Sequence, residues 1–289
     1  MTRTQAILTA LSICSMIAQV SSQGIPDTLS NILSDPSTFF LSAIAMDPQT
    51  IAKIFSSFSG LYCLACLLAP EKSTKMFGYK SDMLSQLYCA YILSAALACS
   101  TVAFFVFFEK AEPLSAIAYG FIPMVLQHLR TLLNWDLHDD LKGRYTKTII
   151  QLWLTVIVFN IIAVYIQVSW ARLSMSCLLY TTLVDGIVGM VSSPTSVRHY
   201  CGEKASIDPY ILAMQRNFSP VILQLITFDL MLLNGMKSER AYGCSMLVAT
   251  SCMIYKRILH KDENTVGLSK AGTTFWFVSY SIMIANLLA

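Results

Sequence analysis

The chain has 289 residues, of which 55% are hydrophobic and only 13% are charged. Soluble domains usually contain about a quarter charged residues, so this composition excludes a soluble globular domain. The formal charge of +3 is small and dispersed along the chain, which argues against nucleic acid as a partner. We therefore expect an all-α, polytopic protein whose main partner is the lipid bilayer.

The N-terminus has the pattern of a secretory signal peptide over residues 1–22. Arg3 precedes an apolar stretch, and Val20 and Ser22 suit the −3 and −1 positions of a cleavage site. An uncleaved signal anchor, which would add a ninth helix, is the alternative. In either case the following segment, residues 23–50, is expected to face the lumen or the cell exterior.

Apolar runs of the length that crosses a bilayer then recur to the end of the chain. Backbone polar groups in lipid must be paired within the segment, so runs of this length are expected to be helices. We predict eight transmembrane helices, over residues 51–69, 84–108, 113–133, 147–168, 172–192, 215–235, 240–258 and 269–288.

The basic residues between these runs predict the orientation. With residues 23–50 outside, fourteen Lys and Arg residues fall on the cytosolic side and five fall on the other side. Cytosolic loops carry an excess of Lys and Arg, so the bias agrees with the signal peptide. We expect both termini to be lumenal or extracellular after signal cleavage, in a membrane of the secretory or endomembrane system or the plasma membrane.

The predicted helices divide into two sets of four, over residues 51–168 and 169–289. The stretches "PEKSTKMFGYK" (70–80) and "PTSVRHYCGEK" (194–204) occupy the same place in each set. We interpret both as cytosolic turns, in which Pro ends one span and Gly allows the bend. An even number of spans in each half predicts parallel repeats that arose by tandem duplication. Accidental similarity between two turns is the alternative.

Asp185 is the leading candidate for a functional residue. Burying an Asp at the centre of a membrane helix costs about 2.5–3.5 kcal/mol on insertion scales, so such residues commonly mark a ligand or ion pathway. Cys177 and Thr181 lie on the same predicted helix face, and Ser174 and Gly189 extend it. We predict that this small, polar face looks into the bundle. The alternative is that these residues only permit close packing.

Three further polar residues lie within predicted spans and are candidates for the same pathway. Asp229 and Gln224 fall in the sixth span, and Asn160 falls in the fourth. Asp229 is expected at a different depth from Asp185, so the two are poor candidates for a shared carboxylate pair. Amides in membrane helices often act as bonds between helices, which is the alternative for Asn160.

The histidines gather toward the predicted cytosolic side but show no metal-binding pattern. Their spacing matches neither a zinc site nor a membrane oxygenase, and the chain lacks nucleotide-binding and hydrolase motifs. We therefore predict no metal, no cofactor and no catalytic residues. His128 and Arg130, near the end of the third span, are candidates for contact with a lipid headgroup or an anion.

These observations favour a protein that binds or transports a small molecule, ion or lipid through a cavity between two four-helix repeats. A non-catalytic membrane scaffold or assembly factor, which would bind other membrane proteins, is the first alternative. The second alternative is an enzyme that acts at the cytosolic face through His128, His138 and the Asp139–Asp140 pair. The enzyme is the less favoured of these.

Overall fold

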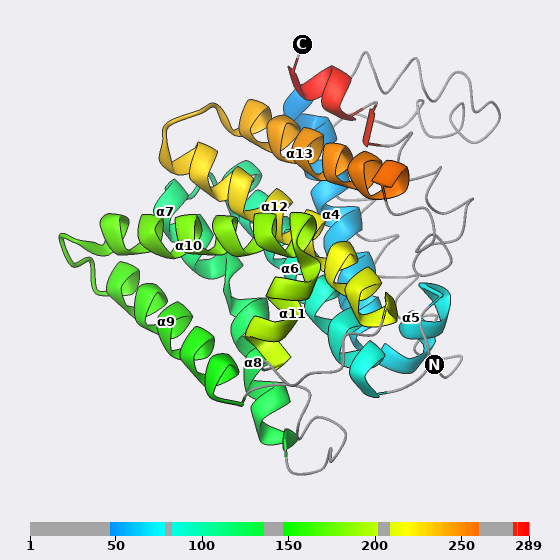
Figure 1. The fold of residues 1–289 in the computed structure, drawn as a ribbon. Coiled ribbons are helices and arrows are strands. Elements are labelled where there is room, and N and C mark those ends of the chain that lie inside the picture. The colour runs from blue at the N-terminus through cyan, green and yellow to red at the C-terminus, as the bar shows by residue number, and fades with distance from the viewer. Residues whose placement is uncertain are drawn as a thin grey trace, which may run out of the picture.

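The computed structural model describes residues 47–78, 83–135, 147–201, 209–259, 280, 281 and 283–288. Within this part every regular element is a helix, and Figure 1 shows their arrangement. The helices are α4 (Pro48–Leu67), α5 (Pro70–Met76), α6 (Met83–Phe107), α7 (Pro113–Gly120), α8 (Ile122–Leu133), α9 (Lys147–Tyr165), α10 (Ala171–Val191), α11 (Ser193–Cys201), α12 (Pro209–Leu233) and α13 (Ser238–Leu259). Residues 280, 281 and 283–288 are also helical.

Five of the described helices are long and apolar enough to cross a membrane, which fits a multi-pass membrane protein. They are α4, α6, α9, α10 and α12, and they correspond to the first, second, fourth, fifth and sixth predicted spans. The predicted all-α class is therefore supported, but eight spans are not confirmed.

The third predicted span, residues 113–133, is divided into α7 and α8 at Phe121. Pro123 stands in the first turn of α8. Its ring has no N–H to donate and clashes with the carbonyl four residues earlier, so a helix that reaches it is commonly broken or kinked. With 8 and 12 residues, neither α7 nor α8 reaches bilayer-spanning length by itself.

The seventh and eighth predicted spans also remain unconfirmed. The seventh corresponds to α13, which has 22 residues but carries Glu239, Arg240, Lys256 and Arg257 at its ends and is not among the five apolar helices. The eighth, residues 269–288, lies mostly outside the described residues. The signal peptide over residues 1–22 and most of segment 23–50 lie outside them as well.

The two stretches that we interpreted as turns are helical where they are described. Pro70 is the first residue of α5, where its missing N–H is harmless because the first helical N–H groups have no partner in the helix. Pro194 lies in the first turn of α11. Gly78, with a φ of +72°, behaves as the predicted bend, and Gly202 of the second stretch lies outside the described residues. Each Pro thus begins a new short helix after the preceding long one.

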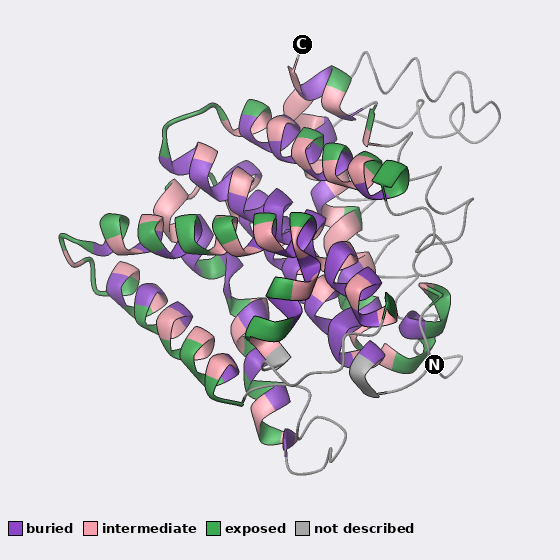
Figure 2. Ribbon diagram, viewed as in Figure 1, coloured by how far each residue is buried: buried purple, intermediate pink, exposed green. Residues whose placement is uncertain are grey.

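The core of the molecule is built around α6 and α12, which pack against each other. In each, 67% of the most apolar 18-residue segment is buried, compared with 28–33% in α4, α9 and α10. Figure 2 shows buried residues concentrated along the central helices, while α9 and α10 present exposed residues at the periphery. Helix α4 packs on α6. Helices α10 and α13 both pack on α12, and α9 packs on the outside of this group, against α10.

Candidate functional site

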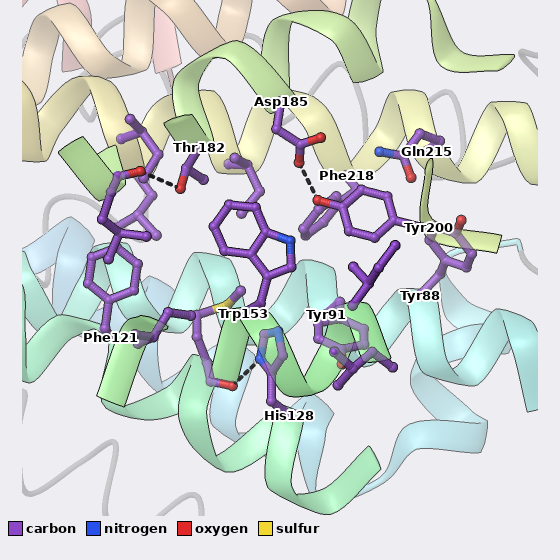
Figure 3. A pocket seen from close by; sticks show the side chains of 18 residues that line it. Tyr88, Tyr91, Phe121, His128, Trp153, Thr182, Asp185, Tyr200, Gln215 and Phe218 are labelled. Carbon is purple, nitrogen blue, oxygen red and sulfur yellow. Dashed lines mark hydrogen bonds between the residues drawn. The ribbon is translucent and has the colours of Figure 1, made fainter. Parts of the chain in front are cut away.

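A cavity lies between helices of the first half of the chain (51–168) and helices of the second half (169–289) (Figure 3). Its volume is about 70 Å³, taken as the space open to the centres of water-sized spheres. One water needs roughly 10–15 Å³ on this measure, so the cavity has room for a small ligand or several waters. The residues that line it are Tyr88, Tyr91, Phe121, Met124, His128, Ile149, Ile150, Trp153, Ile157, Leu178, Thr182, Asp185, Tyr200, Gln215, Phe218, Ile222, Leu225 and Ile226.

Asp185 on α10 and Tyr200 on α11 form the polar pair of this cavity. The Tyr200 hydroxyl donates a hydrogen bond to Oδ2 of Asp185, and Figure 3 shows both groups pointing toward each other. Burial, followed by the neighbouring Asp185 carboxylate, raises the pKa of the Tyr200 hydroxyl well above its usual range. The tyrosine therefore keeps its proton at neutral pH and acts as a donor to Asp185.

A buried polar cluster holds α10, α11 and α12 together beside this pair. Gln215 Nε2 donates to Ser196 Oγ at 3.0 Å, and Ser193 Oγ donates to the Gly189 carbonyl at 2.8 Å. Ser219 Oγ donates to the Gln215 carbonyl at 3.0 Å. Buried hydroxyl and amide groups that are paired in this way give a defined arrangement. The cluster therefore fixes where α11 returns over α10 and brings Tyr200 to Asp185.

Gly189 makes this close packing possible. A Cβ atom added there would lie 2.4 Å from Ser219 Oγ and 3.0 Å from Gln215 Nε2. Gly186, one turn earlier on α10, is similarly close to Leu223, whose Cδ2 would lie 2.9 Å from an added Cβ. Small residues allow helix backbones to approach closely in membrane proteins, and here they allow α10 to lie against α12.

The opposite wall of the cavity comes from the first half of the chain. His128 Nδ1 lies 2.7 Å from the Met124 carbonyl oxygen, and since a carbonyl only accepts, this ring nitrogen is the donor. The Tyr91 and His128 rings pack nearly perpendicular to each other, with 5.2 Å between centroids. Figure 3 shows the Trp153 side chain between this wall and the Asp185–Tyr200 pair. The wall is thus mainly aromatic.

The structure places the predicted residues of α10 on two sides of that helix. Asp185 lines the cavity and is partly buried, but Cys177 and Thr181 are exposed. The neighbouring Thr182 lines the cavity instead, and its hydroxyl donates to the Leu178 carbonyl at 2.8 Å. The small polar face predicted over Ser174, Cys177, Thr181, Asp185 and Gly189 is therefore not presented to the bundle as a whole.

The remaining pathway candidates lie away from the cavity lining. Asn160 is buried, and its Nδ2 donates to the Val156 carbonyl at 2.9 Å. Gln224 is buried and its Oε1 accepts a hydrogen bond from the Tyr280 hydroxyl at 3.0 Å. Asp229 is completely buried on α12. Asp229 is not among the residues that line the cavity with Asp185.

Asp229 has an unusual environment for a carboxyl group. Within the described part of the chain, neither of its carboxyl oxygens has a hydrogen-bond partner. The Cys99 thiol of α6 interacts with it electrostatically. A buried polar group without a partner costs free energy of folding, so this residue is a local weakness of the core.

His128 and Arg130, predicted as contacts for a headgroup or anion, are separated by the structure. His128 is buried and lines the cavity, whereas Arg130 is exposed. Among the other predicted candidates of the cytosolic side, His138, Asp139 and Asp140 lie outside the described residues. The described residues contain no group of three or more His, Cys, Asp and Glu side chains that could hold a metal ion.

The sequence reasoning missed most of the aromatic lining, above all Tyr200 and Trp153. Tyr200 falls in a stretch that we interpreted as a turn, so no helix face was assigned to it. Thr182 could have been found, because positions 178, 182 and 185 follow the spacing of three and four that defines one helix face. Trp153 carried no signal, since it lies between two leucines in a predicted apolar span.

Comparison with protein-family models, with curated proteins and with solved structures found no match for this chain.

Proposed function

We propose that this protein binds or carries a small molecule through the cavity between its two halves, with Asp185 as the principal polar group. The observation that carries the proposal is that one cavity is lined from both halves and contains an acidic side chain. A carboxylate at such a position is expensive in a membrane protein. Convergent polar groups in an otherwise apolar cavity are typical of ligand sites.

We also propose that the two halves are parallel repeats. In the first half, α4 is followed by the short helix α5 and the 25-residue helix α6; in the second, α10 is followed by the short helix α11 and the 25-residue helix α12. In each half the first long helix packs on the second, and the short helix packs on that second helix too. These common features support a tandem duplication.

The proposed topology has eight spans, a cleaved signal peptide and both termini on the lumenal or extracellular side. It rests on the signal-peptide pattern and the unequal distribution of Lys and Arg in the sequence. In this orientation α5 and α11 lie on the cytosolic side. The Asp185–Tyr200 pair then stands at the cytosolic end of the cavity, where a ligand would enter or leave.

The test is a thermal-stability screen of the purified protein in detergent against small cations, anions, neutral molecules and lipids. A ligand that binds only the folded protein raises its melting temperature, by mass action. We expect at least one class to stabilise the wild type, and we expect this shift to be lost in Asp185→Asn.

Cys177→Ala is the matched control, because Cys177 is exposed on the same helix and does not line the cavity. It should keep the full ligand-induced shift. If no compound stabilises the wild type, or if Asp185→Asn responds as the wild type does, the binding proposal is wrong. Recovery of a stable complex with another membrane protein, together with that negative result, would favour the scaffold.

A further inference from the structure

We infer that the ligand of this cavity is a small organic cation, such as an amine or a quaternary ammonium ion. This inference rests on the proposed function and specifies its substrate class. It follows from three properties of the cavity: the sign of its charge, the chemistry of its walls and its size.

The lining carries a negative charge and no permanent positive one. Asp185 is its one carboxylate, and no Lys or Arg occurs among the described residues that line the cavity. The other titratable lining groups are His128 and the hydroxyls of Tyr88, Tyr91 and Tyr200. His199, an exposed residue of α11, also interacts electrostatically with Asp185 but does not line the cavity. An anionic ligand would therefore meet repulsion from Asp185 without a basic residue such as Lys or Arg to bind it.

The carboxylate can accept a further donor. Among the described side chains, Tyr200 donates a hydrogen bond to Asp185, and it does so at Oδ2. A carboxylate accepts several hydrogen bonds through its two oxygens. An ammonium N–H could therefore bind Asp185 while Tyr200 keeps its own bond, so the pair would hold the positive end of a ligand in a fixed direction.

The walls around this carboxylate are aromatic. Six aromatic side chains line the cavity: Tyr88, Tyr91, Phe121, Trp153, Tyr200 and Phe218. The face of an aromatic ring attracts a cation within about 6 Å of its centroid, and Trp attracts it most strongly. Figure 3 shows Trp153 projecting between the two walls, below Asp185. A carboxylate and aromatic ring faces are the two kinds of group that bind alkylated ammonium ions, and the cavity contains both.

A neutral apolar ligand fits this lining less well. It would displace water from Asp185 without replacing the lost hydrogen bonds, and an unsatisfied charged group is costly. The cavity of about 70 Å³ limits the ligand to a small molecule. Its apolar substituents would contact the aliphatic residues of the lining, for example Ile157 and Ile222.

The experiment measures binding to the full-length protein in detergent by calorimetry, at constant ionic strength. The probes are methylammonium and tetramethylammonium, with tert-butanol as a compact neutral counterpart and acetate as an anion. We expect an alkylammonium ion to bind at least about tenfold more tightly than tert-butanol or acetate. Asp185→Asn should weaken this binding at least about tenfold, because it removes the charge that pairs with the cation.

A second variant keeps the test valid if Asp185→Asn folds poorly. Trp153→Leu removes the most strongly attracting ring but leaves the carboxylate, so it should weaken cation binding about threefold to tenfold and weaken tert-butanol binding by less. Cys177→Ala should bind all probes as the wild type does.

The outcomes separate the inference from the proposed function. If tert-butanol or acetate binds as tightly as the ammonium ions, or if Trp153→Leu weakens all probes equally, the cation inference is wrong. The proposed function would then still stand if the broader stability screen yields an Asp185-dependent ligand of another class. If neither experiment finds an Asp185-dependent ligand, both are wrong.

Discussion

At the scale of single residues, the two acids within the long helices have opposite environments. Asp185 is partly buried and receives the Tyr200 hydrogen bond at the cavity. Asp229 is fully buried, and within the described chain its carboxyl oxygens have no hydrogen-bond partner. Their effects on stability should therefore have opposite signs.

We predict that Asp229→Leu stabilises the protein. The leucine has the same branched shape as aspartate, although it is larger, and it removes a buried polar group without a partner, whose burial costs about 1–3 kcal/mol. The melting temperature in detergent, followed by circular dichroism, should rise. Asp185→Leu is the contrasting variant and should lower the melting temperature, because it removes the hydrogen bond that Asp185 accepts from Tyr200. A fall for Asp229→Leu would mean that the carboxyl has a stabilising partner in the folded protein.

At the scale of helices, close contact between α10 and α12 positions the cavity. It depends on Gly186 and Gly189, where an added Cβ would meet side chains of α12. The serines and the glutamine around Gly189 then tie α11 to the same two helices. Loss of this contact would move Tyr200 away from Asp185.

We predict that Gly189→Ala destabilises the protein by about 1–3 kcal/mol, as overpacking of a tight core does. Its Cβ would lie 2.4 Å from Ser219 Oγ, which is itself hydrogen-bonded. Gly60→Ala on α4 is the control, because its nearest contact would be Ser100 Cβ at 3.3 Å and alanine favours a helix by up to about 1 kcal/mol. Chemical or thermal unfolding in detergent measures both. Equal stability of the two variants would contradict the tight α10–α12 contact.

At the scale of the whole molecule, the two halves share one core. Helices α6 and α12 belong to different halves and pack against each other at its centre. The cavity also takes its walls from both halves. Neither half can complete the core or the cavity alone, even if the halves arose by duplication.

We predict that fragments 1–168 and 169–289, expressed separately, do not form the native fold but associate when expressed together. The physical reason is that each fragment alone exposes the surface that α6 and α12 bury in each other. Copurification through a tag on one fragment measures the association, and the melting temperature of the recovered pair shows whether it is native-like. Two fragments that are separately stable and do not associate would contradict the shared core.

The sequence was most informative about the length and position of the helices. Helix α10, Ala171–Val191, was predicted as 172–192, and α6, Met83–Phe107, as 84–108. These bounds are readable because a segment in lipid must satisfy its own backbone and remain apolar across the bilayer. Whether a proline would interrupt a helix was harder to predict. Helix α7 ends just before the turn that leads to Pro123, whereas α12 continues through Pro220.

The candidate site was only partly predictable. The chain alone identified Asp185 as the polar group to examine, because acids within apolar helices are rare and costly. It could not identify Thr182 in place of Thr181, nor Trp153 and Tyr200. These residues belong to the cavity because of how α8, α9, α10, α11 and α12 meet.

By itself, therefore, the sequence determined the all-helical class, the presence of helices long and apolar enough to cross a membrane, and the bounds of α6 and α10 to within one residue. The tertiary structure decided which face of each helix lies inside and which residues share the cavity. The physical reason is that lipid and protein interior are both apolar. The sequence of an apolar helix therefore shows little difference between the side that faces lipid and the side that faces the protein interior. Only packing against neighbouring helices decides which side is which.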